Sequence, residues 1–156
     1  MNLTMGRAKI AAKLRRIIRY TLGGVFILSG IGKFISPGVL IGHLETYFGV
    51  PTPYSLFLSL SLAAFELAIG LLIMVGPAAR LAIVTAIALT TCLSVGQAWL
   101  LLQSAGPTEC GCFGGLVQEE VGWISLSRNL IIILGLVVLL IGPRNKQEPY
   151  SGTEVA

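Results

Sequence analysis

The sequence predicts an all-α membrane protein, a polytopic bundle of four transmembrane helices. Of the 156 residues, 54% are hydrophobic and only 12% are charged, and the mean hydropathy is +0.85. A soluble domain has about 25% charged residues. Four apolar stretches have about the 20 residues that cross a bilayer, and short segments separate them. These observations exclude an ordinary soluble domain and leave room for a single bundle.

The first span is predicted at residues 17–35, after a strongly basic stretch. The pair Ser36-Pro37 ends this span, and Ser36 is expected to be the N-cap of a new helix with Pro37 at its first position. That helix, at residues 39–48, is short and amphipathic. We therefore expect it to lie in the membrane interface rather than to cross the bilayer.

Three further spans follow, separated by proline-containing or glycine-rich segments. The predicted transmembrane domain covers residues 17–142, between a basic tail at 1–16 and a polar tail at 143–156. The three spans are predicted at residues 54–75, 79–102 and 123–141.

Lysine and arginine placement predicts the orientation of the bundle. The tails and the turn at residues 76–77, with Arg80 beside it, hold nine of the eleven Lys and Arg residues, which by the positive-inside rule places both termini in the cytoplasm. The basic N-terminus is interpreted as this cytoplasmic flank, or as a basic amphipathic helix on anionic lipid, in preference to a nucleic-acid-binding arm. The apolar run that follows is longer than that of a cleavable signal peptide and no Ala-x-Ala-like site closes it, so an uncleaved signal anchor is expected.

The segment between the third and fourth spans carries the most distinctive chemistry, the sequence Cys110-Gly111-Cys112. Two cysteines one residue apart reach disulfide distance only by bending the backbone sharply, and a strained, accessible disulfide is more oxidising than a structural one. The orientation places this loop on the periplasmic or extracellular side, where disulfides persist. A purely structural disulfide is the alternative, but a disulfide that closes a loop of one residue lowers the entropy of the unfolded state only slightly.

Ionisable residues within membrane spans are costly and indicate function. Glu66 lies near the middle of the second span, on a face of small residues, and is expected to be protonated because desolvation disfavours its charged form. We expect partners for it on the third span, where Ala86, Thr90 and Gln97 share a face. It would relay protons or donate to a quinone oxygen, unless it only joins two helices.

Two cations lie near the outer ends of spans one and four, Lys33 and Arg128. Each would either snorkel to the interface or supply positive potential that favours the reactive thiolate of a nearby cysteine. At a rise of 1.5 Å per residue, Lys33 is expected to lie roughly 10 Å too far along the bundle for a direct ion pair with Glu66.

Two further residues are candidate members of a site, Cys92 and His43. Cys92 lies within the third span, off its polar face, and is expected to act as a small apolar residue. His43, the only histidine, would complete a metal site with Cys110 and Cys112. Three ligands without a Cys-x-x-Cys pair predict metal weakly, so no metal is expected.

Several of these residues together resemble the DoxX/MauE membrane family, over about residues 17–142. The run at residues 26–34 with Pro37 resembles the first span of that family, and Glu66 its second. The run at residues 110–114, with Arg128 and the following asparagine, resembles the MauE branch. The resemblance implies an architecture related to vitamin K epoxide reductase and DsbB-type thiol oxidases.

In function, the resemblance implies an inner-membrane protein of bacteria that works beside a periplasmic thioredoxin-like protein. MauE proteins assist maturation of the disulfide-rich small subunit of methylamine dehydrogenase, and DoxX relatives are linked to quinone-coupled sulfur oxidation. The chain lacks the second outward cysteine pair of DsbB-type enzymes, so its relay would need a partner thiol or a membrane quinone.

The sequence thus predicts a thiol–disulfide oxidoreductase subunit in which Cys110 and Cys112 exchange disulfides. Lys33, Glu66 and Arg128 are predicted to support them. The alternative is a non-enzymatic membrane scaffold or assembly factor whose thiols are structural or bind metal.

Overall fold

The computed structural model describes residues 2–75, 79–102 and 122–141, with side chains from residue 10 onward. This part of the chain is entirely helical, apart from short connections. Five helices follow one another, α1 (Asn2–Ile35), α2 (Gly38–Phe48), α3 (Thr52–Val75), α4 (Ala79–Leu102) and α5 (Trp123–Ile141). Four of them, all but α2, are long and apolar enough to cross a membrane, which confirms the predicted fold class.

Predicted and observed boundaries agree closely for α4 and α5, and α3 begins only two residues early. Two details differ. Helix α1 begins at Asn2 rather than at residue 17, because a stretch rich in alanine, lysine, arginine and leucine favours helix. Pro37, not Ser36, is the N-cap of α2, since the Ser36 N–H donates to the Gly32 carbonyl and completes the last turn of α1.

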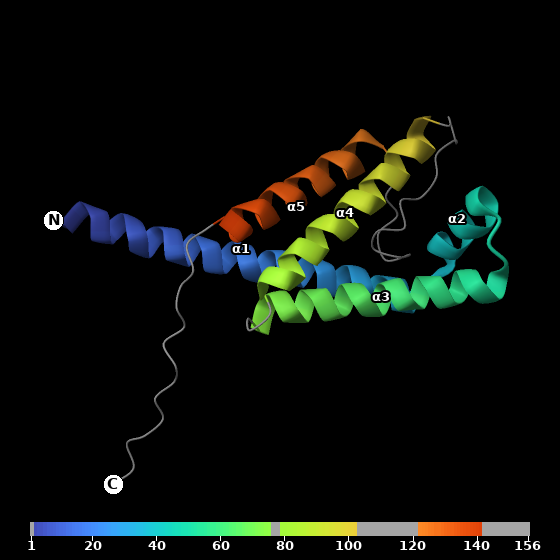
Figure 1. Cartoon of the computed structure of the whole chain (residues 1–156), viewed down its shortest axis with the longest axis horizontal. Helices are drawn as coiled ribbons and strands as arrows, with labels where there is room; N and C mark the ends of the chain where they lie inside the picture. The colour runs from blue at the N-terminus through green and yellow to red at the C-terminus, as the bar shows by residue number, and fades with distance from the viewer. Residues whose placement is uncertain (1, 76–78, 103–121, 142–156) are drawn as a thin grey trace, which may run out of the picture.

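The four long helices are arranged as two antiparallel pairs (Figure 1). Helix α1 packs along α3, and α4 packs along α5. Helix α2 lies beside the beginning of α3 at one end of the bundle, which we call the α2 end. Both the end of α4 and the beginning of α5 lie at this end as well.

Glycines bring α1 and α3 into backbone contact. A Cβ atom at Gly30 would lie 2.8 Å from the carbonyl oxygen of Ala63, and one at Gly70 would lie 2.8 Å from that of Gly23. Small residues at such an interface allow the close packing that holds membrane helices together. The contacts also fix the register, with Gly30 opposite Ala63.

The interior of the bundle is divided along its axis. The half away from α2, which we call the apolar half, is filled by a hydrophobic cluster of Leu22, Phe26, Ile69, Ile73, Ala82, Ile83, Ala86, Leu136 and Leu139. The half towards α2, the polar half, holds every buried polar or charged residue in the described part of the chain, namely Lys33, Ser55, Ser59, Glu66, Thr90, Gln97, Ser125 and Asn129. The boundary crosses all four long helices at one level.

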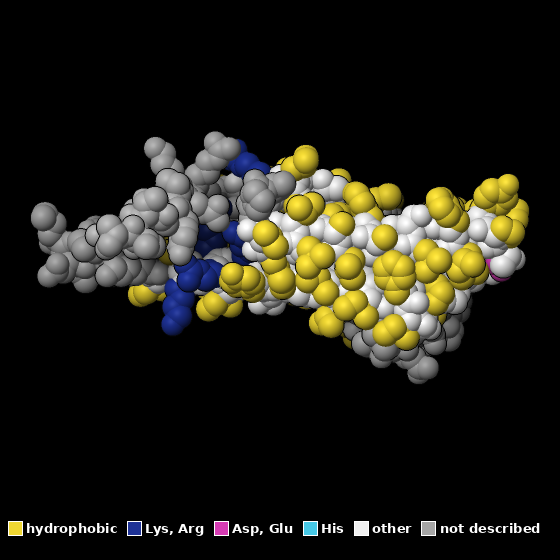
Figure 2. Space-filling view, turned by 90° about the horizontal axis from the view of Figure 1, so that it is seen from below, with side chains coloured by type: hydrophobic (Ala, Val, Ile, Leu, Met, Phe, Trp, Pro, Cys, Tyr) yellow, Lys and Arg dark blue, Asp and Glu magenta, His cyan; other side chains and the backbone are white. Residues whose placement is uncertain are grey.

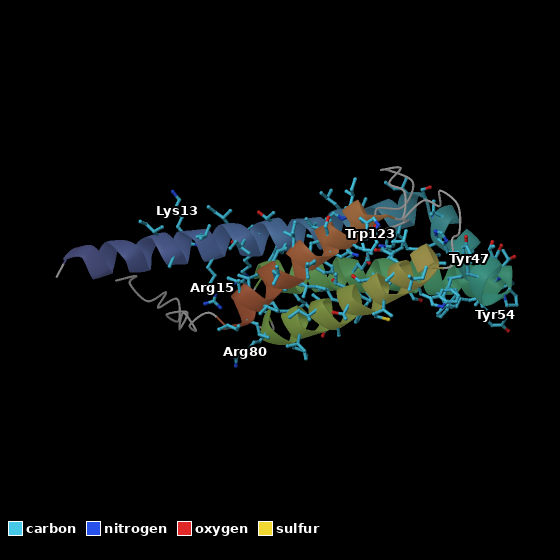
Figure 3. All side chains as sticks on the ribbon, turned by 90° about the horizontal axis from the view of Figure 1, so that it is seen from above. Lys13, Arg15, Tyr47, Tyr54, Arg80 and Trp123 are labelled. Atoms are coloured by element: carbon cyan, nitrogen blue, oxygen red, sulfur yellow. The ribbon has the colours of Figure 1, made fainter. Side chains whose placement is uncertain are left out.

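The outer surface matches a lipid environment. Figure 2 shows apolar side chains spread along the bundle and Lys and Arg side chains gathered at one end, which we call the basic end. Figure 3 places Lys13, Arg15 and Arg80 at that end and Tyr47, Tyr54 and Trp123 at the α2 end. Exposed aromatic rings such as those of Tyr54 and Trp123 mark a membrane–water interface. The chain is a multi-pass membrane protein.

At the basic end, two arginines of α1 bind the carbonyl groups that helix ends leave unpaired. Arg19 donates to the carbonyl oxygens of Ile73 and, at 3.1 Å, Met74 in the last turn of α3. Arg15 donates to the carbonyl oxygen of Leu139 near the end of α5, at 2.9 Å. The sequence suggested only a basic flank, but these residues also join three helices.

Replacing Arg19 by methionine should lower the free energy of unfolding by roughly 1 kcal/mol, the usual contribution of a cation at a helix C-terminus. Arg16→Met is the matched control, since Arg16 is exposed on the same helix. Unfolding in mixed micelles, followed by tryptophan fluorescence, measures both. Equal losses in the two variants would contradict the capping role.

Candidate functional site: a buried ion pair and its cavity

The polar half contains a salt bridge between α1 and α3. The Lys33 Nζ atom lies 2.7 Å from Oε2 and 2.9 Å from Oε1 of Glu66. Both side chains are almost completely buried, because only 4% of the Lys33 side chain and 3% of the Glu66 side chain are exposed. Lys33 therefore does not snorkel to the interface, and one of the two alternatives for this residue is wrong.

The expectation that Lys33 and Glu66 lie too far apart for an ion pair is also wrong. With Gly30 opposite Ala63, their Cα atoms are six residues apart along the axis, which is about 9 Å. However, side chains on an α-helix tilt towards the N-terminus of their own helix. In an antiparallel pair these tilts converge, so the lysine and glutamate side chains reach each other across the offset.

Ser29 completes a closed hydrogen-bonded group. Its hydroxyl donates to Glu66 Oε2 at 2.8 Å and accepts from Lys33 Nζ at 2.9 Å. Lys33 thus has three acceptors within 2.9 Å, and both carboxylate oxygens of Glu66 are bonded. A buried ion pair is tolerated when its remaining polar atoms are satisfied in this way. The expectation of a protonated Glu66 rested on desolvation and did not include the cation that lies beside the carboxyl in the structure.

The partners expected for Glu66 on the third span are not its hydrogen-bond partners. Its hydrogen bonds come from α1, because the glycine contacts bring α1 closer to α3 than any other helix. Gln97 of α4 instead accepts a hydrogen bond from Asn129 Nδ2 of α5, at 3.0 Å. Ser59, Ala63 and Gly70 are buried with Glu66, as predicted from their shared face.

A cavity of about 50 Å³ adjoins the ion pair, between α1, α4 and α5. Lys33 and Ser29 form its polar wall on α1, and Thr90, Arg128 and Asn129 face them from the other two helices. Apolar side chains complete the lining, namely Val25, Phe26, Leu93 and Ile132. The two cations that the sequence singled out, one turn inside opposite helix ends, are therefore brought to one cavity.

Asn129 is a member of this site that the sequence analysis did not assign from its own pattern. It lies four residues after Ser125 on helix α5, and both side chains are buried. Residues at that spacing share a helix face. Two polar residues on one face of α5 were therefore the signal from which a buried role for Asn129 could have been predicted. Ser125 bonds the backbone of Gly122 and holds the first turn of α5.

Cys110 and Cys112 lie outside the described residues, so neither a disulfide nor a distance to the cavity is assigned. The helices that flank them are described. Leu102 ends α4 and Trp123 begins α5 at the α2 end, and Arg128 is the sixth residue of α5. The chain enters and leaves the cysteine segment at the polar half of the bundle.

The two other candidates lie away from the cavity. Cys92 is an exposed thiol on α4, as expected for a residue off the polar face. His43 of α2 stacks on Tyr47, with ring centroids 5.8 Å apart. Phe48 at the end of α2 contacts Trp99 of α4, also at 5.8 Å, so α2 reaches across the α2 end from α3 to α4.

Comparison with known proteins agrees with this architecture. Residues 11–142 match the family model described as methylamine utilisation protein MauE. A methylamine utilization protein MauE of Paracoccus denitrificans is 27% identical over 122 residues, which cover 74% of this chain and 62% of that protein. No solved structure matches. Since the family model covers most of the chain, including most of α1 and all of α3, α4 and α5, this protein belongs to the MauE family.

Proposed function

We propose that the protein is an integral-membrane thiol–disulfide redox protein, with Cys110 and Cys112 as its exchanging thiols. It supports disulfide formation in a client, or electron transfer, together with a thioredoxin-like partner outside the cytoplasm. The name of the Paracoccus denitrificans relative refers to methylamine utilisation, and the disulfide-rich subunit of methylamine dehydrogenase is the corresponding client. The basic end lies in the cytoplasm and the α2 end faces the periplasm, in agreement with the positive-inside rule.

The observation that carries this proposal is the gathering of Lys33 and Arg128 at one cavity in the polar half, where the cysteine segment joins α4 and α5. Positive charge near a cysteine favours its thiolate, the reactive form. Because Glu66 lies 2.7 Å from Lys33 and offsets its charge, Arg128 is the stronger of the two candidates for this role.

The exchange proceeds through a mixed disulfide. A thiolate of the reduced partner attacks one sulfur of the Cys110–Cys112 disulfide, so that bond breaks as a bond to the partner forms. The second partner thiolate then displaces that sulfur. The partner leaves oxidised, and this protein keeps two electrons and two thiols. A membrane quinone restores the disulfide by taking up the two electrons and two protons.

Serine substitutions test the proposal directly. A thioredoxin-like partner that lacks its second cysteine should stay joined to Cys110 or Cys112 in a mixed disulfide that a reductant releases, visible as a heavier band on a non-reducing gel. The double variant Cys110→Ser/Cys112→Ser should form none and lose support of the client. Cys92→Ser is the matched control, since that thiol is exposed on the outside of α4. Trapping of both redox forms with an impermeant maleimide on intact cells reports orientation at the same time.

The scaffold alternative makes the opposite prediction. A double serine variant that still supports the client, with cysteines whose redox state never changes during growth, would show that the thiols are incidental. The protein would then act as a non-enzymatic assembly factor.

A further inference from the structure

The polar half contains the cavity beside the Lys33–Glu66 pair, and the proposed thiol exchange says nothing of what fills it. We propose that this cavity binds a small cluster of water molecules that connects the ion pair with the α2 side of the membrane and with that side alone. Protons on Lys33 then exchange with water from the α2 end, although the pair is buried among transmembrane helices. This inference does not depend on the function of the cysteines.

The size and lining of the cavity support the presence of water. A water molecule needs roughly 10–15 Å³ of cavity volume measured in this way, so about 50 Å³ accommodates a few molecules. Cavities that stay dry are apolar. Most of the lining surface of this cavity is apolar, but polar groups of Lys33, Arg128, Ser29, Thr90 and Asn129 also face it, and these groups are the partners for water.

The division of the bundle makes the access one-sided. Beyond Glu66 and Thr90, towards the basic end, the interior is closed by the hydrophobic cluster defined above. Ala86 and Leu136 there are completely buried, and an apolar core of this kind leaves no space or partners for water. Towards the α2 end, the buried residues include the polar Gln97 and Ser125 together with the apolar Leu100.

The inward orientation of Lys33 indicates that the ion pair is a specific site. It lies two residues from the end of α1, where its side chain has the length to snorkel into the interface. Instead it is turned inward and bonded to Ser29 and Glu66. Ionisable residues within a membrane indicate function. We therefore expect a function for this ion pair, since Lys33 stays in the interior although its side chain could reach the interface.

Water-edited solid-state NMR on the full-length protein in lipid bilayers tests the inference. The Lys33 Nζ and Asn129 side-chain signals should receive magnetisation from water rapidly, whereas the methyl groups of Ala86 and Leu136 should receive none. The Lys33 signal is assigned by its loss in Lys33→Met. A Lys33 ammonium as isolated from water as Ala86 would show that the cavity is dry, and equal transfer to Ala86 would show that access is not one-sided.

A cavity-filling variant sharpens the test. Thr90→Met should abolish water transfer to Lys33, because Thr90 faces the cavity. Thr91→Met is the matched control, since Thr91 is exposed on the outside of the same helix, and it should leave the transfer unchanged. Equal effects of the two substitutions would overturn the proposed route, while the wild-type measurement stands even if Thr90→Met fails to fold.

Discussion

Replacing Lys33 by methionine is expected to lower the free energy of unfolding by about 3–5 kcal/mol, the cost of removing one partner of a buried ion pair. The substitution leaves the Glu66 carboxyl in the interior, near the middle of α3, with no cation beside it and no route to the interface. Unfolding in mixed micelles, followed by the fluorescence of Trp99 and Trp123, measures the loss. Lys13→Met is the matched control, since Lys13 is exposed on the same helix.

The reciprocal variant should be milder. In Glu66→Gln, Lys33 regains the freedom to snorkel, because it is two residues from the end of α1 and its side chain is long enough to reach the interface. We expect less than half of the loss seen with Lys33→Met. An equal or larger loss would mean that Lys33 cannot leave the interior.

The double variant Lys33→Met/Glu66→Gln separates structure from function. Replacement of a whole buried ion pair by uncharged residues is often neutral, so stability should return to within about 1–2 kcal/mol of the wild type. If the pair serves only to join α1 to α3, the double variant will also support the client normally. Restored stability with lost function would show that the charged groups act in the reaction.

The second large effect is expected at the α1–α3 contact. Gly70→Ala would place a Cβ atom 2.8 Å from both the Gly23 carbonyl oxygen and the Ile27 Cγ1 atom. Because one of these neighbours is backbone, the helices must move apart, and overpacking of this kind costs about 1–3 kcal/mol. Separation of α1 from α3 would also lengthen the Lys33–Glu66 contact.

Gly24→Ala is the control for this substitution. Its Cβ would lie 3.7 Å from the nearest atom, the Cε of Met74, which is an ordinary contact. Both variants gain the same helix propensity of alanine over glycine, about 1 kcal/mol, so the difference between them reports packing alone. If Gly70→Ala and Gly24→Ala unfold alike, the close approach of α1 and α3 does not limit stability.

Much of the architecture is determined by local sequence. The lengths of the apolar stretches, and the prolines and glycines between them, predicted α3, α4 and α5 to within two residues, because a membrane span must be a continuous apolar helix. Local pattern also placed Lys33, Glu66 and Arg128 as the exceptional residues, since charge within a span is rare. Periodicity was sufficient to show that Cys92 lies off the polar face.

Only the tertiary structure decided which of these residues meet. The sequence pattern predicted partners for Glu66 on α4. Instead, glycine contacts bring α1 against α3, and the convergent tilt of side chains in an antiparallel pair closes the distance to Lys33. The pairing of Asn129 with Gln97, and the division of the interior into an apolar and a polar half, likewise depend on helix register. Register is set by contacts between segments far apart in the chain, so no pattern within a single helix contains it.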